Sequence, residues 1–486
     1  MDPESHKQIV QALLARKILV SQAMLEKIKA LDSDEKIELI KKRIESGAVS
    51  EGSVFEVLSF KGENTCGIDE GSVEIVSSYV EQAVKKKEVS DFVSYFRNRY
   101  RAVEQILKNR PELRATVSLS RVLERRSSEK VSVIGIVFDK SETKNGNIVL
   151  SIEDVSGSMK VIINKNRPDV FSEAKDIVPD EIIGVVGTNK EKIIFADSIY
   201  WPDIPLHKEL KKSPDEAYAV FLSDLHVGSS NFLGEKLDKF ISWLSGGFDE
   251  HRDVVDKIKY LFIVGDLVDG VGIYPGQEDE LLIKDIYEQY EECAKILSRI
   301  PRRIKIILCP GNHDAMRISE PQPPVSVELA PALYQMENVV MVSNPAIVRI
   351  HKSDSFPGFD ILVYHGYCFD YYVSNVDSIR NQGGYHRADL LMKFLLKRRH
   401  LSPSHSATLY IPDITYDPLV ISSIPDFFIT GHIHYTVAAS YNNVTLICGS
   451  CWQSQTAFQV KVGHDPEPAR VPLVNLQTRK VKILKF

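Results

Sequence analysis

Residues 259–269 read KYLFIVGDLVD, an apolar run that ends in a glycine and two carboxylates. Such a run, bounded by polar residues, is typical of a strand that is buried on both faces in a parallel sheet. Residues 303–314, RIKIILCPGNHD, repeat the pattern, and residues 279–300 between them have helical periodicity. A strand, a helix and a second strand in this order predict an α/β domain.

The same pattern recurs on both sides of this unit, in AYAVFLSDLH (217–226), ILVYHG (361–366) and FFITGHIH (427–434). Residues just beyond the carboxyl ends of strands in an open α/β sheet gather at one crevice. We therefore expect five polar clusters to meet in space. They contain Asp224 and His226; Asp266 and Asp269; Asn312 and His313; His365; and His432 and His434.

The side chains in these clusters are of one chemical kind. Carboxylate, amide and imidazole donors without thiolates suit hard or borderline divalent ions such as Mn²⁺, Fe²⁺ or Zn²⁺. One such cluster alone is more often a hydrogen-bonded surface or core group, but all five in this order favour a metal centre. The donor set does not distinguish the three metals.

Two other patterns precede this domain. Residues 1–62 carry apolar side chains at helical spacing, which predicts a small helical module, and the charged helical text from Val73 to Leu107 predicts a helical linker region over 63–115. From residue 116 to 205, short β-branched runs separated by turn residues predict a small five-stranded barrel, and its hairpin at 152–163 resembles that of an OB-fold. Such a barrel binds single strands or supports its neighbours.

Composition sets outer limits on function. The net charge of −6 neither indicates nor excludes nucleic acid, so a polyanion would be held by local patches or metals. The sequence contains no uninterrupted apolar run of the roughly 20 residues that a membrane span needs, and it begins without the apolar core of a secretory signal. We expect a soluble, cytoplasmic protein without a membrane partner.

From Ala217 to the C-terminus, the five clusters resemble the calcineurin-like metallophosphoesterase superfamily, whose α/β domain has four layers and holds two metals. The resemblance implies such a domain over 213–486, with Asp266 bridging both ions and His313 as a catalytic acid oriented by the carboxylate of Asp269. It implies that Asp224, His226 and His434 hold the first metal, and Asn312, His365 and His432 the second. Gly270 stands where protein phosphatases of the superfamily have an arginine, which disfavours that activity.

A barrel in front of such a domain is similar to the B-subunits of replicative DNA polymerases. The stretches 391–403 (LMKFLLKRRHLSP) and 416–420 (YDPLV) resemble the archaeal members of this group, the small subunits of family D polymerases. This resemblance implies a metal-dependent 3′–5′ exonuclease, with Mn²⁺ as the expected ion, that proofreads for a large catalytic subunit in a heterodimer. The alternative is a non-catalytic scaffold subunit that keeps metals for stability.

The expected nucleic-acid partner is a single-stranded or mismatched DNA 3′ end. Lys393, Lys397, Arg398 and Arg399 form a basic helix end that would draw a strand toward the metals, although a solvated face or a contact to the partner subunit explains it equally well. Tyr367 and Tyr371, just after His365, are candidates for stacking on a terminal base. The sliding clamp is a further candidate partner, but the C-terminal VKILKF carries no clear clamp-binding motif.

Overall fold

The computed structural model describes residues 71–81, 86–125, 128–247 and 252–486. The helical module predicted for residues 1–62 lies outside the described residues, and so do residues 63–70 of the predicted linker region. The chain from Gly71 to Phe486 forms one compact unit.

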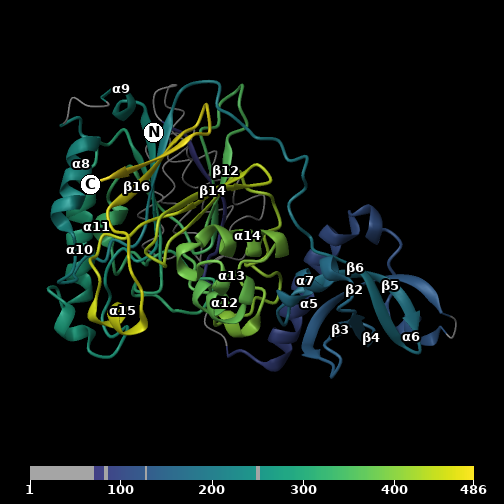
Figure 1. The fold of residues 1–486 in the computed structure, drawn as a ribbon. Helices are drawn as coiled ribbons and strands as arrows, with labels where there is room; N and C mark the ends of the chain where they lie inside the picture. Colours follow the sequence, from purple (N-terminus) through teal and green to yellow (C-terminus); the bar gives the residue numbers. More distant parts are fainter. Residues whose placement is uncertain (1–70, 82–85, 126–127, 248–251) are drawn as a thin grey trace, which may run out of the picture. The chain divides into compact units, whose positions relative to one another are not determined.

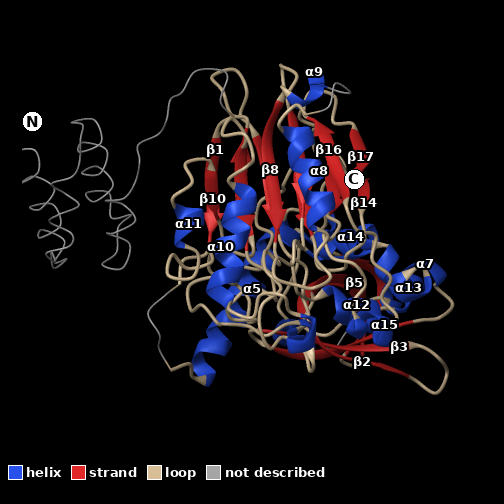
Figure 2. Ribbon diagram, turned by 90° about the vertical axis from the view of Figure 1, so that its left-hand side faces the viewer, coloured by secondary structure: helices blue, strands red, loops and turns tan. Residues whose placement is uncertain are grey.

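Among the described residues, six strands form a first sheet in the spatial order β10-β9-β8-β7-β16-β17 (Figure 2). Their bounds are β7 (Tyr218–Leu222), β8 (Ile258–Val264), β9 (Lys305–Cys309), β10 (Val339–Met341), β16 (Arg470–Asn475) and β17 (Val481–Lys485). β7 to β10 run parallel, whereas β16 and β17 pair antiparallel. The three apolar runs predicted to be buried parallel strands in this part of the chain are therefore confirmed as β7, β8 and β9.

A second six-stranded sheet in the described part of the chain has the order β1-β11-β12-β13-β15-β14. Its strands are β1 (Val73–Ser78), β11 (Ala346–Ile350), β12 (Phe359–Val363), β13 (Phe427–Thr430), β14 (Val437–Tyr441) and β15 (Val444–Cys448). The central strands β12, β13 and β15 are parallel. The runs that precede His365 and Gly431 are thus neighbouring strands whose carboxyl ends point the same way.

The two sheets face each other across an apolar cluster. Phe221 and Phe262 from the first sheet stack at a centroid distance of 5.4 Å, and Phe221 lies 6.3 Å from Phe427 of the second sheet. Successive strand side chains alternate between faces, so each sheet has a second apolar face. Helices cover this face in both sheets (Figure 1). α8 (Gly234–Leu244) and α10 (Ile286–Leu297) cover the first sheet. α12 (Phe369–Asn375) and α14 (Ala388–Arg398) cover the second.

The remaining helices are shorter or lie outside these layers. They are α5 (Val89–Lys108), α6 (Leu119–Glu124), α7 (Pro168–Lys175), α9 (Arg252–Val255), α11 (Pro331–Tyr334), α13 (Asp377–Asn381) and α15 (Ala457–Val462). Single 3₁₀ turns occur at η1 (Pro111–Leu113), η2 (Gln277–Glu280), η3 (Gly384–His386) and η4 (His405–Ala407). In the described ranges, no helix combines the length and apolar character that crossing a bilayer requires.

The β-branched runs between residues 116 and 205 form a closed barrel with the strand order β2-β3-β4-β6-β5. The strands are β2 (Glu129–Glu142), β3 (Ile148–Asp154), β4 (Gly157–Ile163), β5 (Ile182–Lys190) and β6 (Ile193–Tyr200). Its interior is aliphatic, with Val133, Leu150 and Ile183 fully buried. The five strands expected in this region are therefore present and closed upon themselves.

The stretch predicted as helical from Val73 to Leu107 needs a correction at its start. Val73–Ser78 is strand β1, which pairs antiparallel with β11 at the edge of the second sheet. Its sequence VEIVSS contains β-branched residues that fit a pleated surface, and an available sheet edge decides between strand and helix. Among the described residues of this stretch, α5 is the helical part; its Tyr100 and Val103 pack against barrel residues, and its Tyr95 packs in the core of the second sheet.

Candidate metal centre

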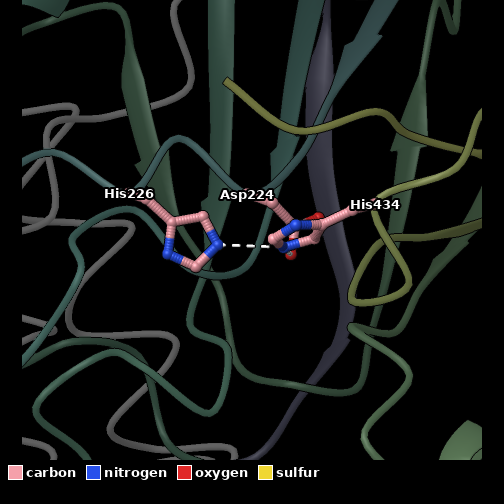
Figure 3. A group of neighbouring side chains, drawn as sticks. All are labelled: Asp224, His226 and His434. Atoms are coloured by element: carbon pink, nitrogen blue, oxygen red, sulfur yellow. Dashed lines mark hydrogen bonds and ion pairs between the residues drawn. The ribbon is translucent and has the colours of Figure 1, made fainter. Parts of the chain in front are cut away.

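Asp224, His226 and His434 form the first group of converging side chains, at the ends of β7 and β13. All three are buried, and Figure 3 shows the two imidazole rings pointing toward each other beside the carboxylate. His226 Nε2 lies 3.0 Å from His434 Nε2, which lies 3.3 Å from Asp224 Oδ1. Buried donor atoms that face one another this closely form a suitable pocket for a cation.

The second group contains Asp266, His365 and His432, whose donor atoms lie within 4.8 Å of one another. Asn312 Oδ1 joins it at 2.9 Å from His365 Nε2. Asp266 Oδ2 lies 3.4 Å from His365 Nε2 and 3.9 Å from His226 Nε2 in the first group. A single carboxylate therefore reaches both groups of ligands.

Hydrogen bonds outside the two groups fix the orientation of the imidazoles. His365 donates from Nδ1 to the carbonyl of Val264 at 3.1 Å, and His226 Nδ1 bonds Asp269 Oδ1 at 3.0 Å, so that Nε2 of each ring faces the centre. Such partners set the tautomer of a metal-binding histidine. His432 Nε2 lies 3.1 Å from Asp370 Oδ2, an acidic partner that no sequence motif indicated.

His313 is held differently from the sequence prediction. Its Nδ1 donates to the backbone carbonyl of Asp269 at 2.8 Å, whereas the carboxylate oxygen Oδ1 of Asp269 is 4.0 Å away. That carboxylate instead bonds His226, and it accepts from Gln453 at 2.9 Å. The hydrogen bond of His313 thus goes to the backbone of Asp269 and not to its carboxylate, because the loop that follows β8 presents its carbonyl to His313 and its side chain to His226.

The electrostatics of the centre favour ionised carboxylates. Burial raises the pKa of Asp266, but the nearby imidazoles of His365 and His313 outweigh it and hold this pKa well below its ordinary value. Burial likewise raises the pKa of Asp224, and the hydrogen bond from His434 brings it below the ordinary value. Both groups are therefore anionic at neutral pH, as metal ligands must be.

Asp314 has a structural role in the turn that presents Asn312 and His313. Its carboxylate accepts from the backbone N–H of Gly311 at 2.8 Å and of Leu267 at 3.2 Å, and from the hydroxyl of Tyr290 at 3.0 Å. Burial raises the pKa of Asp314 to about 7, and the charge of Asp266 adds to this effect. Asp314 thus connects the ends of β8 and β9.

Backbone strain is concentrated in the same clusters. Five of the predicted ligands have a left-handed backbone, with φ of 52° at Asp224, 53° at His226, 49° at Asp266, 72° at His432 and 54° at His434. This conformation is uncommon outside glycine, although Asp and His tolerate it better than most residues. Such strain persists where the surroundings enforce it, and it gathers at functional sites.

Two glycines allow the strand ends to approach one another. A Cβ on Gly311 would lie 2.2 Å from Asp266 Oδ1, and a Cβ on Gly265 would lie 2.1 Å from His365 Nδ1. Gly265 also has a φ of +77°. No larger residue fits at either place without moving a ligand.

The basic end of α14 does not lie at this centre. Arg398 is 5% exposed and forms an ion pair with Glu181 of the barrel, and Arg399 is 3% exposed and donates to the carbonyls of Ile421 and Ser422. We therefore do not propose these two arginines as DNA contacts. Their partners come from segments distant in the chain, which the local sequence KRR cannot reveal.

The other predicted DNA contacts differ from one another. Lys397 Nζ lies 2.8 Å from Glu173 and 4.0 Å from the ring centre of Trp201, and Lys393 Nζ lies 2.9 Å from Asp389. Tyr371 is partly buried and packs edge-on against Tyr372, which lies in the core of the second sheet. Tyr367 is half-buried beside the predicted ligand His432, with ring centres 5.7 Å apart. Of the two tyrosines, Tyr367 therefore lies next to a predicted metal ligand.

Comparison with known proteins agrees with this arrangement. The family model for the B-subunits of DNA polymerases alpha and epsilon matches residues 219–438, which contain every predicted ligand. A DNA polymerase II small subunit from Methanothermobacter thermautotrophicus is 38% identical over 415 residues, or 85% of this chain and 83% of that protein. The chain belongs to the DNA polymerase II small subunit family.

Other members of the family are similar over comparable lengths. The small subunit from Pyrococcus furiosus is 38% identical over 82% of this chain and 64% of its own length, and that from Halobacterium salinarum is 35% identical over 87% and 80%. The expected family membership is therefore confirmed. As a family member, the chain is a small subunit of a DNA polymerase, with buried Asp and His groups that can hold metal ions.

Proposed function

We propose that this DNA polymerase small subunit is a two-metal 3′–5′ exonuclease that removes mismatched nucleotides for the large catalytic subunit. The observation that carries the proposal is the position of Asp266, whose one carboxylate oxygen lies within 3.4 Å of His365 and 3.9 Å of His226, between two separate ligand groups. Two ions that share a carboxylate supply the activation of water and the neutralisation of phosphate charge that phosphodiester hydrolysis requires.

The chain's own groups fit the remaining chemistry. The Nδ1 atom of His313 is committed to the carbonyl of Asp269, so Nε2 is the atom of this ring that is left to transfer a proton. With 16% of its side chain exposed, His313 is more accessible than His226, at 1%. We assign it the transfer of a proton to the departing 3′-oxygen, which is general acid catalysis.

The proposed ions are Mn²⁺, with Fe²⁺ and Zn²⁺ as chemical alternatives for the same donors. The sets are Asp224, His226 and His434 for one ion; Asn312, His365 and His432 for the other; and Asp266 for both. The ionised state of Asp224 and Asp266 and the inward-facing Nε2 atoms of His226 and His365 support this division.

We further propose that the sandwich of two helix-covered sheets is a four-layer calcineurin-like domain and that the closed barrel is an OB-fold. The strand order β2-β3-β4-β6-β5, with parallel pairing of β4 and β6, supports the second assignment. The buried ion pair between Arg398 and Glu181 joins the two parts. A barrel fixed in this way supports the phosphoesterase domain, whether or not it also contacts DNA.

A primer-degradation assay tests the exonuclease. The full chain is incubated with Mn²⁺ and a 5′-labelled primer that carries a mismatched 3′ end, with and without a large subunit. Stepwise shortening from the 3′ end that EDTA abolishes is the expected result. A purified chain that contains two ions and cleaves nothing, alone or in the complex, would instead identify a metal-stabilised scaffold subunit.

A further inference from the structure

A row of aromatic rings leads from the buried ligands to the surface. The rings of His226 and His313 meet edge-on at a centroid distance of 4.7 Å, and Tyr274 lies 6.4 Å beyond His313. Phe458 then stacks on Tyr274 at 5.2 Å, with an interplanar angle of 23°. Exposure rises along the row, and Phe458 is 43% exposed. It belongs to the short helix α15, which Figure 1 labels.

Both stacked rings are held by polar contacts. The Tyr274 hydroxyl donates to Glu280 Oε2 at 2.7 Å, and the other oxygen of Glu280 accepts from the backbone N–H of Ala457, next to Phe458. On the other side of Phe458, Gln459 Nε2 lies 2.9 Å from Nδ1 of the ligand His434. Phe458 is thus fixed relative to the metal centre through its two sequence neighbours, although its ring is partly in solvent.

An exposed aromatic ring in a fixed position has a specific use in binding nucleic acid. Burying a large apolar ring stabilises a protein, so a ring left accessible on a rigid support is available to a ligand. Aromatic side chains stack on unpaired bases, and this interaction tolerates any base because every base presents a flat π-face. Phe458 has one face on Tyr274, and with 43% of the residue exposed, part of the ring is accessible to a base.

The direction of the reaction determines which base of the strand stacks on Phe458. This inference rests on the exonuclease proposed above. Hydrolysis breaks the bond between phosphorus and the 3′-oxygen of the preceding nucleotide, and an oxygen from water forms the new bond to phosphorus. The 3′-oxygen takes up a proton and remains on the shortened strand, while the terminal nucleotide departs as a 5′-monophosphate. If His313 supplies that proton, the preceding nucleotide lies on the His313 side of the phosphate, where Tyr274 and Phe458 are.

We propose that the Tyr274–Phe458 pair is a stacking platform for the base of the nucleotide that precedes the scissile phosphate. A base in a duplex is already stacked and paired, so the platform engages a strand only where its last nucleotides are frayed. The pair thereby selects unpaired 3′ ends. It differs from Tyr367, which lies beside His432.

The test compares two substrates and two positions on one helix. Single-stranded oligonucleotides carry either a normal or an abasic penultimate nucleotide, and kcat/KM for release of the terminal nucleotide is measured with Mn²⁺. For Phe458→Ala, we expect a loss of about ten-fold on the normal strand and little change on the abasic strand. Phe458→Trp, which keeps an aromatic face, should retain activity. Val460→Ala, at a 62% exposed position on the same helix, is the matched control.

Failure of this inference is distinguishable from failure of the exonuclease. If the wild-type chain cleaves the normal strand but Phe458→Ala loses nothing, or loses equally on both strands, the platform is refuted and the exonuclease stands. If the wild-type chain cleaves neither strand, fluorescence anisotropy in EDTA decides instead. The platform then requires that Phe458→Ala weaken binding of the normal oligonucleotide more than binding of the abasic one.

Discussion

Two regions of this molecule carry clusters of polar residues in the sequence, but the folded chain arranges them in different ways. The clusters after β7, β8, β9, β12 and β13 meet in one buried centre, whereas the basic stretch at the end of α14 is distributed among partners elsewhere in the chain. In the first region, five separate segments bring their side chains within a few ångströms of each other. In the second, adjacent residues such as Arg398 and Arg399 face different neighbours.

The difference shows what makes a polar motif predictable. Residues at the carboxyl ends of parallel strands converge because the sheet itself sets the strand spacing and direction, so a local signal has a fixed consequence in space. The exposure of a charged residue at a helix end depends on whatever packs against the helix. For Arg398, that is Glu181, more than 200 residues earlier in the chain.

Replacing the carboxylate that reaches both ligand groups should have the largest effect. Asp266→Ala should lose at least one of the two ions and all measurable nuclease activity, because neither group retains its shared anionic ligand. Metal content by mass spectrometry after dialysis and the primer assay measure these effects. A variant that keeps both ions and normal turnover would show that Asp266 is not the shared metal ligand.

His313→Ala separates catalysis from metal binding in the same region. We expect both ions to remain and turnover to fall by about a hundred- to ten-thousand-fold, the usual contribution of a general acid. A substrate with a good leaving group such as p-nitrophenolate needs no protonation, so the variant should hydrolyse it much more nearly like the wild type. An equal loss on both substrates would contradict the role of proton donor.

Arg398→Ala tests whether the basic end of α14 has a structural role. Removal of one member of a buried ion pair leaves Glu181 uncompensated, and we expect a destabilisation of about 3 to 5 kcal/mol, seen as a lower melting temperature. Lys393→Ala is the control, since its ion pair with Asp389 is more exposed and should contribute less. A stable Arg398 variant that had lost only DNA affinity would restore the role predicted from sequence.

His400, which follows the basic stretch and is also buried, should make the stability of the fold depend on pH. Burial, together with the charge of Arg99, lowers the pKa of His400 to about 4, against an ordinary value of 6.5. The folded state therefore resists a proton that the unfolded chain accepts, and stability should decrease by up to about 3 kcal/mol as the pH falls from 6.5 to 4. Melting temperatures over this range should change less for His400→Gln than for the exposed His207→Gln.

Asp269→Asn should give the smallest effect. It tests whether the carboxylate of Asp269 orients His226 or His313. Because the carboxylate bonds His226 at 3.0 Å and lies 4.0 Å from His313, whose hydrogen bond goes to the carbonyl of Asp269, we expect metal affinity to weaken about ten- to hundred-fold, with turnover at saturating Mn²⁺ largely retained. Metal titration by calorimetry and kcat at saturating metal separate the two effects. A loss confined to kcat would indicate that the carboxylate orients His313, as the sequence predicted.

The sequence predicted the fold best where a single segment determines its own environment. The apolar runs before Asp224, Asp266 and Asn312 form buried parallel strands, because a short, continuous apolar stretch with a polar end suits a strand that is covered on both faces. The strand β1 was misread as helix because its pairing partner, β11, lies some 270 residues further along the chain and is invisible to local periodicity.

The sequence by itself determined which residues can bind metal and in what order they occur, since donor chemistry is a property of each side chain and strand ends are marked by composition. Only the tertiary structure decided which atom of Asp269 bonds His313, that Asp370 and Gln459 contact the predicted ligands His432 and His434, and that Arg398 is buried against the barrel. The physical reason is the same in each case. These contacts depend on packing between distant segments, and packing is fixed by the whole fold and not by neighbours in the chain.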